Sequence, residues 1–159
     1  MNIEITSFVG RVELVQRKAI ITILKRAVRD LRLPGQGELS LVFVSAKEIN
    51  RLNKLHRKHN CATTNLSFSS LDIVINKPLA KQLSKIKSKD LELHYGEIFL
   101  CPSEIVKYAK QSDLSCLHAL VYLTLHSFLH LVGYKHTTSK DEKKMNSVMN
   151  KILDQKYVI

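Results

Sequence analysis

The segment from Leu114 to Val132 constrains the fold most, because it is apolar on nearly all sides. A helix with this composition has no face to present to water, so it must be buried in the core. His126 and His130 interrupt it four residues apart. On a helix, this spacing places both imidazoles on one face, one turn apart. We therefore predict a buried central helix that carries a pair of imidazoles.

A third histidine follows the predicted helix. Gly133 allows the helix to end and the chain to reverse, so that His136 can return over the pair. Three neutral imidazoles suit one zinc ion and leave a fourth coordination position open, as in catalytic sites. The alternative is that these are buried histidines with satisfied hydrogen bonds, which explains the spacing and the glycine less well.

The charge and the cysteines indicate partners and compartment. The 159 residues include 25 Lys and Arg against 14 Asp and Glu, a net charge of +11 that attracts polyanions such as nucleic acid. A merely basic soluble protein is the open alternative. Three scattered cysteines, Cys61, Cys101 and Cys116, argue against a disulfide framework. The N-terminus does not resemble a signal peptide, and no segment has the length of a membrane span. We expect a cytoplasmic protein without a membrane partner.

Apolar periodicity and turn residues predict an α+β fold with a small mixed β-sheet covered by helices, in one domain over residues 1–159. Strands are expected over 3–8, 38–44, within 66–76 and over 97–100. Helices are expected over 11–31, 46–58, 102–111, 114–132 and 140–156. Ser45 and Glu48 have the spacing of a capping box for the second of these helices. The lysine-rich residues 77–96 are expected to form a solvated insertion with a short helix.

Three stretches of the chain are similar to the motifs of one family. The run HSFLHLVGYKH, from His126 to His136, resembles the signature HGxLHLxGYDH of the YbeY family, metal-dependent endoribonucleases that mature ribosomal RNA. As in that family, an acidic pair and a methionine follow it. Residues 52–68 partly match the family pattern LNxxyRxxdxpTDVLSF, and residues 96–100 resemble its GDIvI strand. The resemblance implies a single YbeY-like domain with a metzincin-like metal site.

The chain departs from these motifs in several places. Ser127 stands where the family has glycine, and Lys135 where it has aspartate. The aspartate of TDVLSF falls on Thr64, or on Asn65 if a gap is placed differently. A carboxylate beside a metal-binding histidine can orient the ligand, whereas a lysine repels the cation. Either Lys135 points to solvent, or the affinity for the metal is reduced.

The resemblance also implies roles for individual residues. His126, His130 and His136 would hold one zinc ion. Arg57 matches the arginine of the family pattern, and its planar, permanently charged guanidinium suits the scissile phosphate; without the resemblance, an ordinary exposed arginine is the simpler interpretation. Other basic side chains are candidates for RNA phosphates. These are Lys54, Lys58, Lys81, Lys85, Lys87 and Lys89.

The general base is absent from the pattern. Metzincin proteases carry a glutamate directly after the first histidine, where this chain has Ser127. A hydroxyl cannot accept a proton at neutral pH as a carboxylate does, which disfavours a metallopeptidase. An RNA substrate instead brings its own 2′-OH as a potential nucleophile. We expect either water activated by the metal or a metal-assisted 2′-OH to attack.

Taken together, the motifs predict a zinc-dependent, single-strand-specific endoribonuclease in ribosomal RNA processing. By resemblance, its task is maturation of the 16S rRNA 3′ end and ribosome quality control, with ribosomal RNA or its precursor as substrate. Ribosomal proteins and a ribosome-associated GTPase are the implied protein partners. The alternatives are a non-catalytic, zinc-stabilised ribosome-assembly factor and, less favoured, a metallopeptidase.

Overall fold

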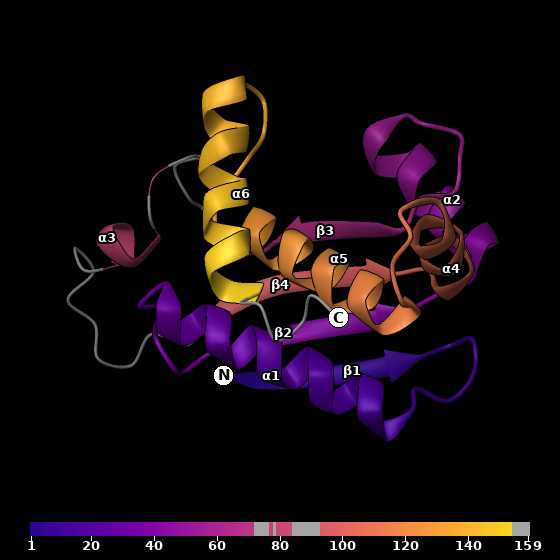
Figure 1. The fold of residues 1–159 in the computed structure, drawn as a ribbon, viewed down its shortest axis with the longest axis horizontal. Helices are drawn as coiled ribbons and strands as arrows, with labels where there is room; N and C mark the ends of the chain where they lie inside the picture. The colour runs from indigo at the N-terminus through magenta and orange to yellow at the C-terminus, as the bar shows by residue number, and fades with distance from the viewer. Residues whose placement is uncertain (72–76, 78, 84–92, 154–159) are drawn as a thin grey trace.

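The computed structural model describes residues 1–71, 77, 79–83 and 93–153 (Figure 1). Its described strands form one mixed sheet in the order β1-β2-β4-β3. The first three in this order are parallel, and β3 is antiparallel to β4. The strands are β1 (Asn2–Ser7), β2 (Glu38–Phe43), β3 (Asn65–Ser69) and β4 (His94–Leu100). The small mixed sheet predicted from the sequence is confirmed.

One helix is central to the packing. Helix α5 lies against three other helices, α1, α4 and α6, and against strands β3 and β4 (Figure 1). The described helices are α1 (Leu14–Asp30), α2 (Ala46–Arg57), α3 (Leu79–Leu83), α4 (Pro102–Gln111), α5 (Cys116–Leu131) and α6 (Ser139–Leu153). Leu39, Leu41 and Phe43 alternate along β2 and are buried in the same core as α5. The predicted buried central helix is therefore present.

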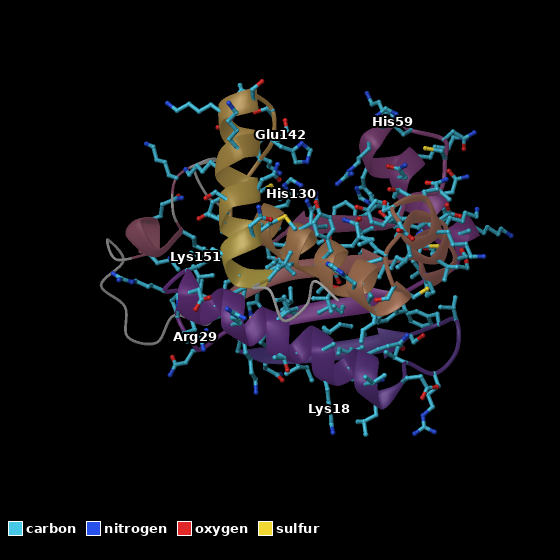
Figure 2. The ribbon with its side chains drawn as sticks, in the orientation of Figure 1. Lys18, Arg29, His59, His130, Glu142 and Lys151 are labelled. Carbon is cyan, nitrogen blue, oxygen red and sulfur yellow. The ribbon has the colours of Figure 1, made fainter. Side chains whose placement is uncertain are left out.

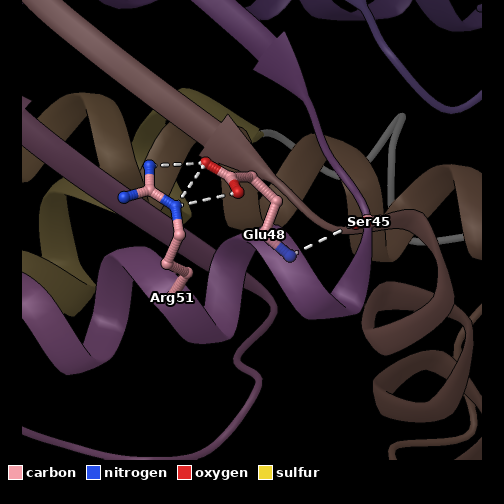
Figure 3. A network of polar contacts seen from close by, with 3 residues as sticks. All are labelled: Ser45, Glu48 and Arg51. Atoms are coloured by element: carbon pink, nitrogen blue, oxygen red, sulfur yellow. Dashed lines mark hydrogen bonds and ion pairs between the residues drawn. The ribbon is translucent and has the colours of Figure 1, made fainter.

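Helix α2 forms a second, smaller core. Val44, Ile49 and Leu66 are buried there together, away from the main core. The helix starts at Ser45, whose Oγ accepts a hydrogen bond from the Glu48 N–H at 3.2 Å. The carboxylate of Glu48 does not return to Ser45, because it forms an ion pair with Arg51 at 2.8 Å (Figure 3). Of the two predicted hydrogen bonds of the capping box, the one accepted by Ser45 is confirmed. The prediction of the reciprocal bond from the Ser45 N–H to the Glu48 carboxylate is wrong.

The starts of two elements differ from the prediction by three residues, and the other described bounds differ by at most two. Helix α1 begins at Leu14 rather than at residue 11, because Glu13 caps it with its N–H bonded to Gln16 Oε1 at 3.0 Å. Strand β4 begins at His94, three residues earlier than expected, because its backbone already pairs with β2 at Glu38 and Leu39. In this extension, Tyr95 is buried and its hydroxyl donates to the Pro34 carbonyl at 3.0 Å.

Parts of the prediction lie outside the described residues. The strand region expected within 66–76 is seen as β3, and its residues 72–76 are not described. The short helix expected in the insertion is α3, whereas residues 84–92 are not described. The last residues of the predicted final helix, 154–156, are also not described.

None of the described helices is by itself long and apolar enough to cross a membrane. Helices α4 and α5 reach that length and composition only when they are counted together across their 109° bend.

Gly96 has a conformation and a contact that only glycine permits. Its φ is +122°, and a Cβ there would lie 2.1 Å from the carbonyl oxygen of Phe68 on β3. We expect Gly96→Ala to lower the free energy of unfolding by about 3 kcal/mol, from backbone strain and overpacking together. Urea denaturation of the metal-free protein measures this. Gly35→Ala is the control, because a Cβ at Gly35 meets nothing within 4 Å; equal losses in the two variants would contradict the prediction.

Candidate metal centre

The end of α5 reverses the chain through a glycine, as the sequence predicts. Gly133 has φ +97°, its N–H bonds the His130 carbonyl at 3.1 Å, and the Tyr134 N–H bonds the Leu129 carbonyl at 2.9 Å. This pair of bonds is a Schellman motif, which satisfies the last carbonyls of a helix. The reversal carries His136 toward α5, where each of the three histidines offers a ligand atom, all within 4.8 Å of one another.

The His130 ring is held in one orientation by the same reversal. Its Nδ1 lies 2.8 Å from the carbonyl oxygen of Tyr134. Since a carbonyl only accepts, Nδ1 must carry the proton in the neutral imidazole, and Nε2 then presents a lone pair. That Nε2 faces the Nε2 of His126 at 3.0 Å. The backbone therefore acts as the outer partner that a metal-binding histidine needs.

The donor set fits a small divalent cation. Tetrahedral zinc with nitrogen ligands at 2.0–2.1 Å requires those nitrogens to lie about 3.3 Å apart. The separation of 3.0 Å between His126 and His130 is close to this value, and the ring centroid of His136 lies 5.4 Å and 5.0 Å from theirs. Within the described part of the chain, no other group of histidine, cysteine or acidic residues has metal-site geometry. Three imidazoles leave one tetrahedral position for a further ligand.

The environment keeps the imidazoles of His126 and His130 neutral. Burial is the main cause that lowers the pKa of His126 to about 4, and repulsion from the other two imidazoles and Arg57 acts in the same direction. Burial also lowers the pKa of His130 to about 4, and repulsion from Lys135 contributes, whereas the hydrogen bond to Tyr134 opposes the shift. Both rings are therefore in the form that binds metals at neutral pH.

Two cationic side chains act on the cluster. Arg57, the exposed last residue of α2, lowers the pKa of both His126 and His130 through its charge. Lys135 is half-buried, and its charge reaches His130. Lys135 is therefore not directed only to solvent. The charges of Arg57 and Lys135 both act on the centre before any metal binds.

The other predicted basic residues are only partly placed by the structure. Lys54 and Lys58 are exposed at the end of α2, on either side of Arg57. Lys85, Lys87 and Lys89 lie outside the described residues, as does the side chain of Lys81.

The remaining histidines have other contacts. The ring of His56 packs against Phe68 with centroids 4.6 Å apart, and the Nδ1 of His94 lies 3.2 Å from the carboxylate of Glu38. His118 lies in the first turn of α5, where its N–H bonds the capping Ser115. Figure 2 shows His130 on the side of the molecule where α2 ends and α6 begins, with His59 and Glu142 labelled there.

Sequence reasoning missed several groups that build this centre. The Tyr134 carbonyl is a backbone atom, so no residue pattern indicates its role. Asn65 and Ser127 share a hydrogen bond at 2.7 Å across 62 positions of sequence. The only hint in the sequence was that residues 64–65 and 127 depart from the family motifs. That Asn65 and Ser127 lie next to each other could not be known without the fold.

These observations define an α+β protein with a three-histidine centre beside an arginine. The sequence model of the family described as Endoribonuclease YbeY matches residues 6–157. The Endoribonuclease YbeY of Bacillus pumilus is 30% identical over 152 residues, which cover 96% of this chain and 92% of that protein. That of Limosilactobacillus fermentum is 32% identical over 145 residues, 91% and 90% of the two chains. The chain therefore belongs to the YbeY family of endoribonucleases.

A solved structure has the same fold. The solution structure of TM1509 from Thermotoga maritima superposes with a TM-score of 0.55 at 21% identity, covering 95% of this chain and 89% of that one. At this identity the likeness bears on the fold alone.

We expect the purified chain to bind one divalent ion through the three histidines. Replacing His126, His130 or His136 with alanine should lower zinc affinity by at least about 100-fold, more than the loss of an outer partner costs. Competition with a chromogenic chelator measures the affinity, and elemental analysis gives the stoichiometry. His118→Ala, on the same helix but outside the cluster, should bind zinc as the unchanged protein does. Undiminished zinc binding by the three variants would rule out the centre.

The lowered pKa values predict acid sensitivity of the metal-free protein. In the unfolded chain, imidazoles gain protons as pH falls through about 6.5. In the folded state, His126 and His130 stay neutral until about pH 4. The unfolded state thus binds more protons between these values, so stability is lost as pH falls through this window. Thermal unfolding from pH 7.5 to 4.5 measures this, and the double variant H126Q/H130Q should show a shallower decline. If the thermal midpoints of the two proteins fall in parallel as the pH is lowered, the prediction is contradicted.

Proposed function

We propose that this chain is a zinc-dependent, single-strand-specific endoribonuclease that processes ribosomal RNA. The observation that carries the proposal is a cluster of three imidazoles that leaves a coordination position free, in which the charge of Arg57 lowers the pKa of His126 and of His130. The relatives named endoribonucleases match the chain over most of its length. A net charge of +11 suits a polyanionic substrate.

The residues divide into two roles. His126, His130 and His136 would hold the ion, which when bound supplies Lewis acidity toward a phosphoryl oxygen and lowers the pKa of water. Arg57 would bind the scissile phosphate through its fork of N–H donors and stabilise the negative charge that develops on it. Lys54 and Lys58, exposed on the same helix end, would bind neighbouring phosphates without reading the bases.

The biological setting belongs to the same proposal. We assign the activity to maturation of the 16S rRNA 3′ end and to ribosome quality control, carried out by one domain over residues 1–159. Ribosomal proteins and a ribosome-associated GTPase would be its partners. We place it in the cytoplasm, since Cys61, Cys101 and Cys116 are free thiols.

The surroundings of Ser127 argue against a peptidase. It stands where metzincin proteases carry their glutamate base. Its side chain is fully buried, and its Oγ accepts a hydrogen bond from Asn65. A buried hydroxyl engaged in this way cannot serve as the base for water.

The test is cleavage of single-stranded RNA by the zinc-loaded protein, with duplex RNA and a denatured protein as competing substrates. We expect cleavage of the single strand only, and none by His130→Ala. Arg57→Ala should lower kcat/KM by about 100-fold, the size of effect seen when one charge-stabilising donor is removed. Arg57→Lys should recover only part of it, because an ammonium is not a planar fork.

Lys18→Ala is the matched control for the loss of one positive charge, since Lys18 is exposed on α1 and points away from the centre (Figure 2). The kcat/KM of this variant should stay within about twofold of that of the unchanged protein, as is usual when a distant exposed charge is removed. Proteolysis without RNA cleavage would overturn the proposal in favour of a peptidase. RNA binding without any cleavage would indicate a non-catalytic assembly factor.

A further inference from the structure

A chain of side-chain hydrogen bonds connects the edge strand β3 to the metal-carrying helix α5. Thr64 Oγ1 donates to Asn65 Oδ1 at 2.7 Å, and Asn65 Nδ2 donates to Ser127 Oγ at 2.7 Å. Ser127 is fully buried and directly follows His126 in α5. The chain of bonds therefore ends one residue away from the first candidate ligand.

A second bond joins the same two elements further along. Ser69 Oγ donates to the backbone carbonyl of Leu131 at 3.1 Å, and Leu131 directly follows His130. Strand β3 thus holds the helix at the residue after each of the two histidines. Because the two attachment points on α5 are about one turn apart, the helix cannot slide along or rotate against β3 without breaking one of the bonds.

The other end of the chain of bonds, Thr64, lies in the segment that follows Arg57. Residues 58–64 join α2 to β3, and their backbone is tied down twice. Asn53 Nδ2 donates to the Cys61 carbonyl at 2.9 Å, and the Cys101 N–H donates to the Thr64 carbonyl at 2.9 Å. Asn53 is itself buried on α2, four residues before Arg57. Arg57 and His126 are thereby held relative to the same segment.

Asn65 and Ser127 both depart from the family motifs. With Leu66 and Phe68 on the last residues of TDVLSF, its valine falls on Asn65, and the signature HGxLH places glycine at Ser127. A valine side chain needs no hydrogen-bond partner, and a glycine has no side chain that could supply one. The half-buried amide of Asn65 loses part of its contact with water where it turns toward α5, and the hydrogen bond to Ser127 compensates for this loss. The two departures satisfy each other.

The geometry points to Asn65 and Ser127 as a coupled pair of positioning residues, which set His126 relative to Arg57. They act through α5 and not through contact with the metal or the substrate. The consequence for cleavage rests on the proposed function, whereas the consequence for the histidine rings exists in the metal-free protein.

A double-mutant cycle tests the coupling with N65V, S127A and N65V/S127A. The S127A variant should lower zinc affinity about tenfold, as loss of an outer support does, because the half-buried Asn65 amide is left without its acceptor on α5. The N65V variant should lower it only about threefold, since Ser127 can turn its hydroxyl to a carbonyl of the preceding helical turn. The double variant should return to within about twofold of the unchanged protein, because neither polar group is then left.

Tyr95→Phe is the matched control. It removes another hydrogen bond, from the buried Tyr95 hydroxyl to the Pro34 carbonyl, that involves neither α5 nor β3. The ring itself, which packs against Phe128 of α5 with centroids 5.5 Å apart, is kept by phenylalanine. It should lower the thermal midpoint of the metal-free protein without changing zinc affinity. A merely structural role for Asn65 and Ser127 predicts the same behaviour for S127A as for Tyr95→Phe, and that result would overturn the inference. Losses that simply multiply in the double variant would overturn it as well.

NMR of the imidazole nitrogens in the metal-free protein gives a readout independent of zinc and RNA. We expect the His126 resonances to move in S127A, to return in N65V/S127A and to stay in place in Tyr95→Phe. If the unchanged protein neither binds zinc nor cleaves RNA while the resonances follow this pattern, the proposed function fails and the coupling stands. If zinc binding and cleavage are present but the resonances do not move, the coupling fails and the proposed function stands.

Discussion

The burial of α5 is the constraint on which the rest of the structure depends. Its side chains from Ala119 to Leu131 are mostly withdrawn from water, including the hydroxyls of Thr124 and Ser127. A helix of this kind is stable only when other elements cover it on several sides, because burial of apolar surface is the main favourable term in folding. Helices α1, α4 and α6 and the strands β3 and β4 supply this cover. Only the face with His126 and His130 stays half-exposed.

The same burial prepares the centre for a metal ion. Taking imidazoles out of water disfavours their charged form, so their pKa values fall and the lone pairs stay available. Arg57 and Lys135 strengthen this effect and also make the surroundings attractive to phosphate. The cost is repulsion of the cation, which no carboxylate among the metal-site ligands offsets. The arrangement therefore favours a metal site that works on an anion.

Much of the architecture followed from local patterns. The spacing of His126 and His130 and the glycine after them predicted both the helix and its reversal, because each depends on residues close in sequence. Apolar alternation located β2 for the same reason. The early start of β4 could not be predicted, since it depends on backbone pairing of His94 and Gly96 with Glu38 and Leu39 on the distant strand β2. The capping box at Ser45 formed only one of its two hydrogen bonds, because Arg51 competes for the Glu48 carboxylate.

The sequence by itself determined the helix that must be buried, the three imidazoles and the turn that brings them together, since all of these are encoded within one short run of residues. Only the tertiary structure decided which groups surround that run. Arg57 approaches from α2 and Asn65 from β3, and Lys135 comes within electrostatic reach of His130 after the chain reverses. The physical reason is that contacts between distant segments depend on how the sheet and helices pack, and no local pattern of residues records that packing.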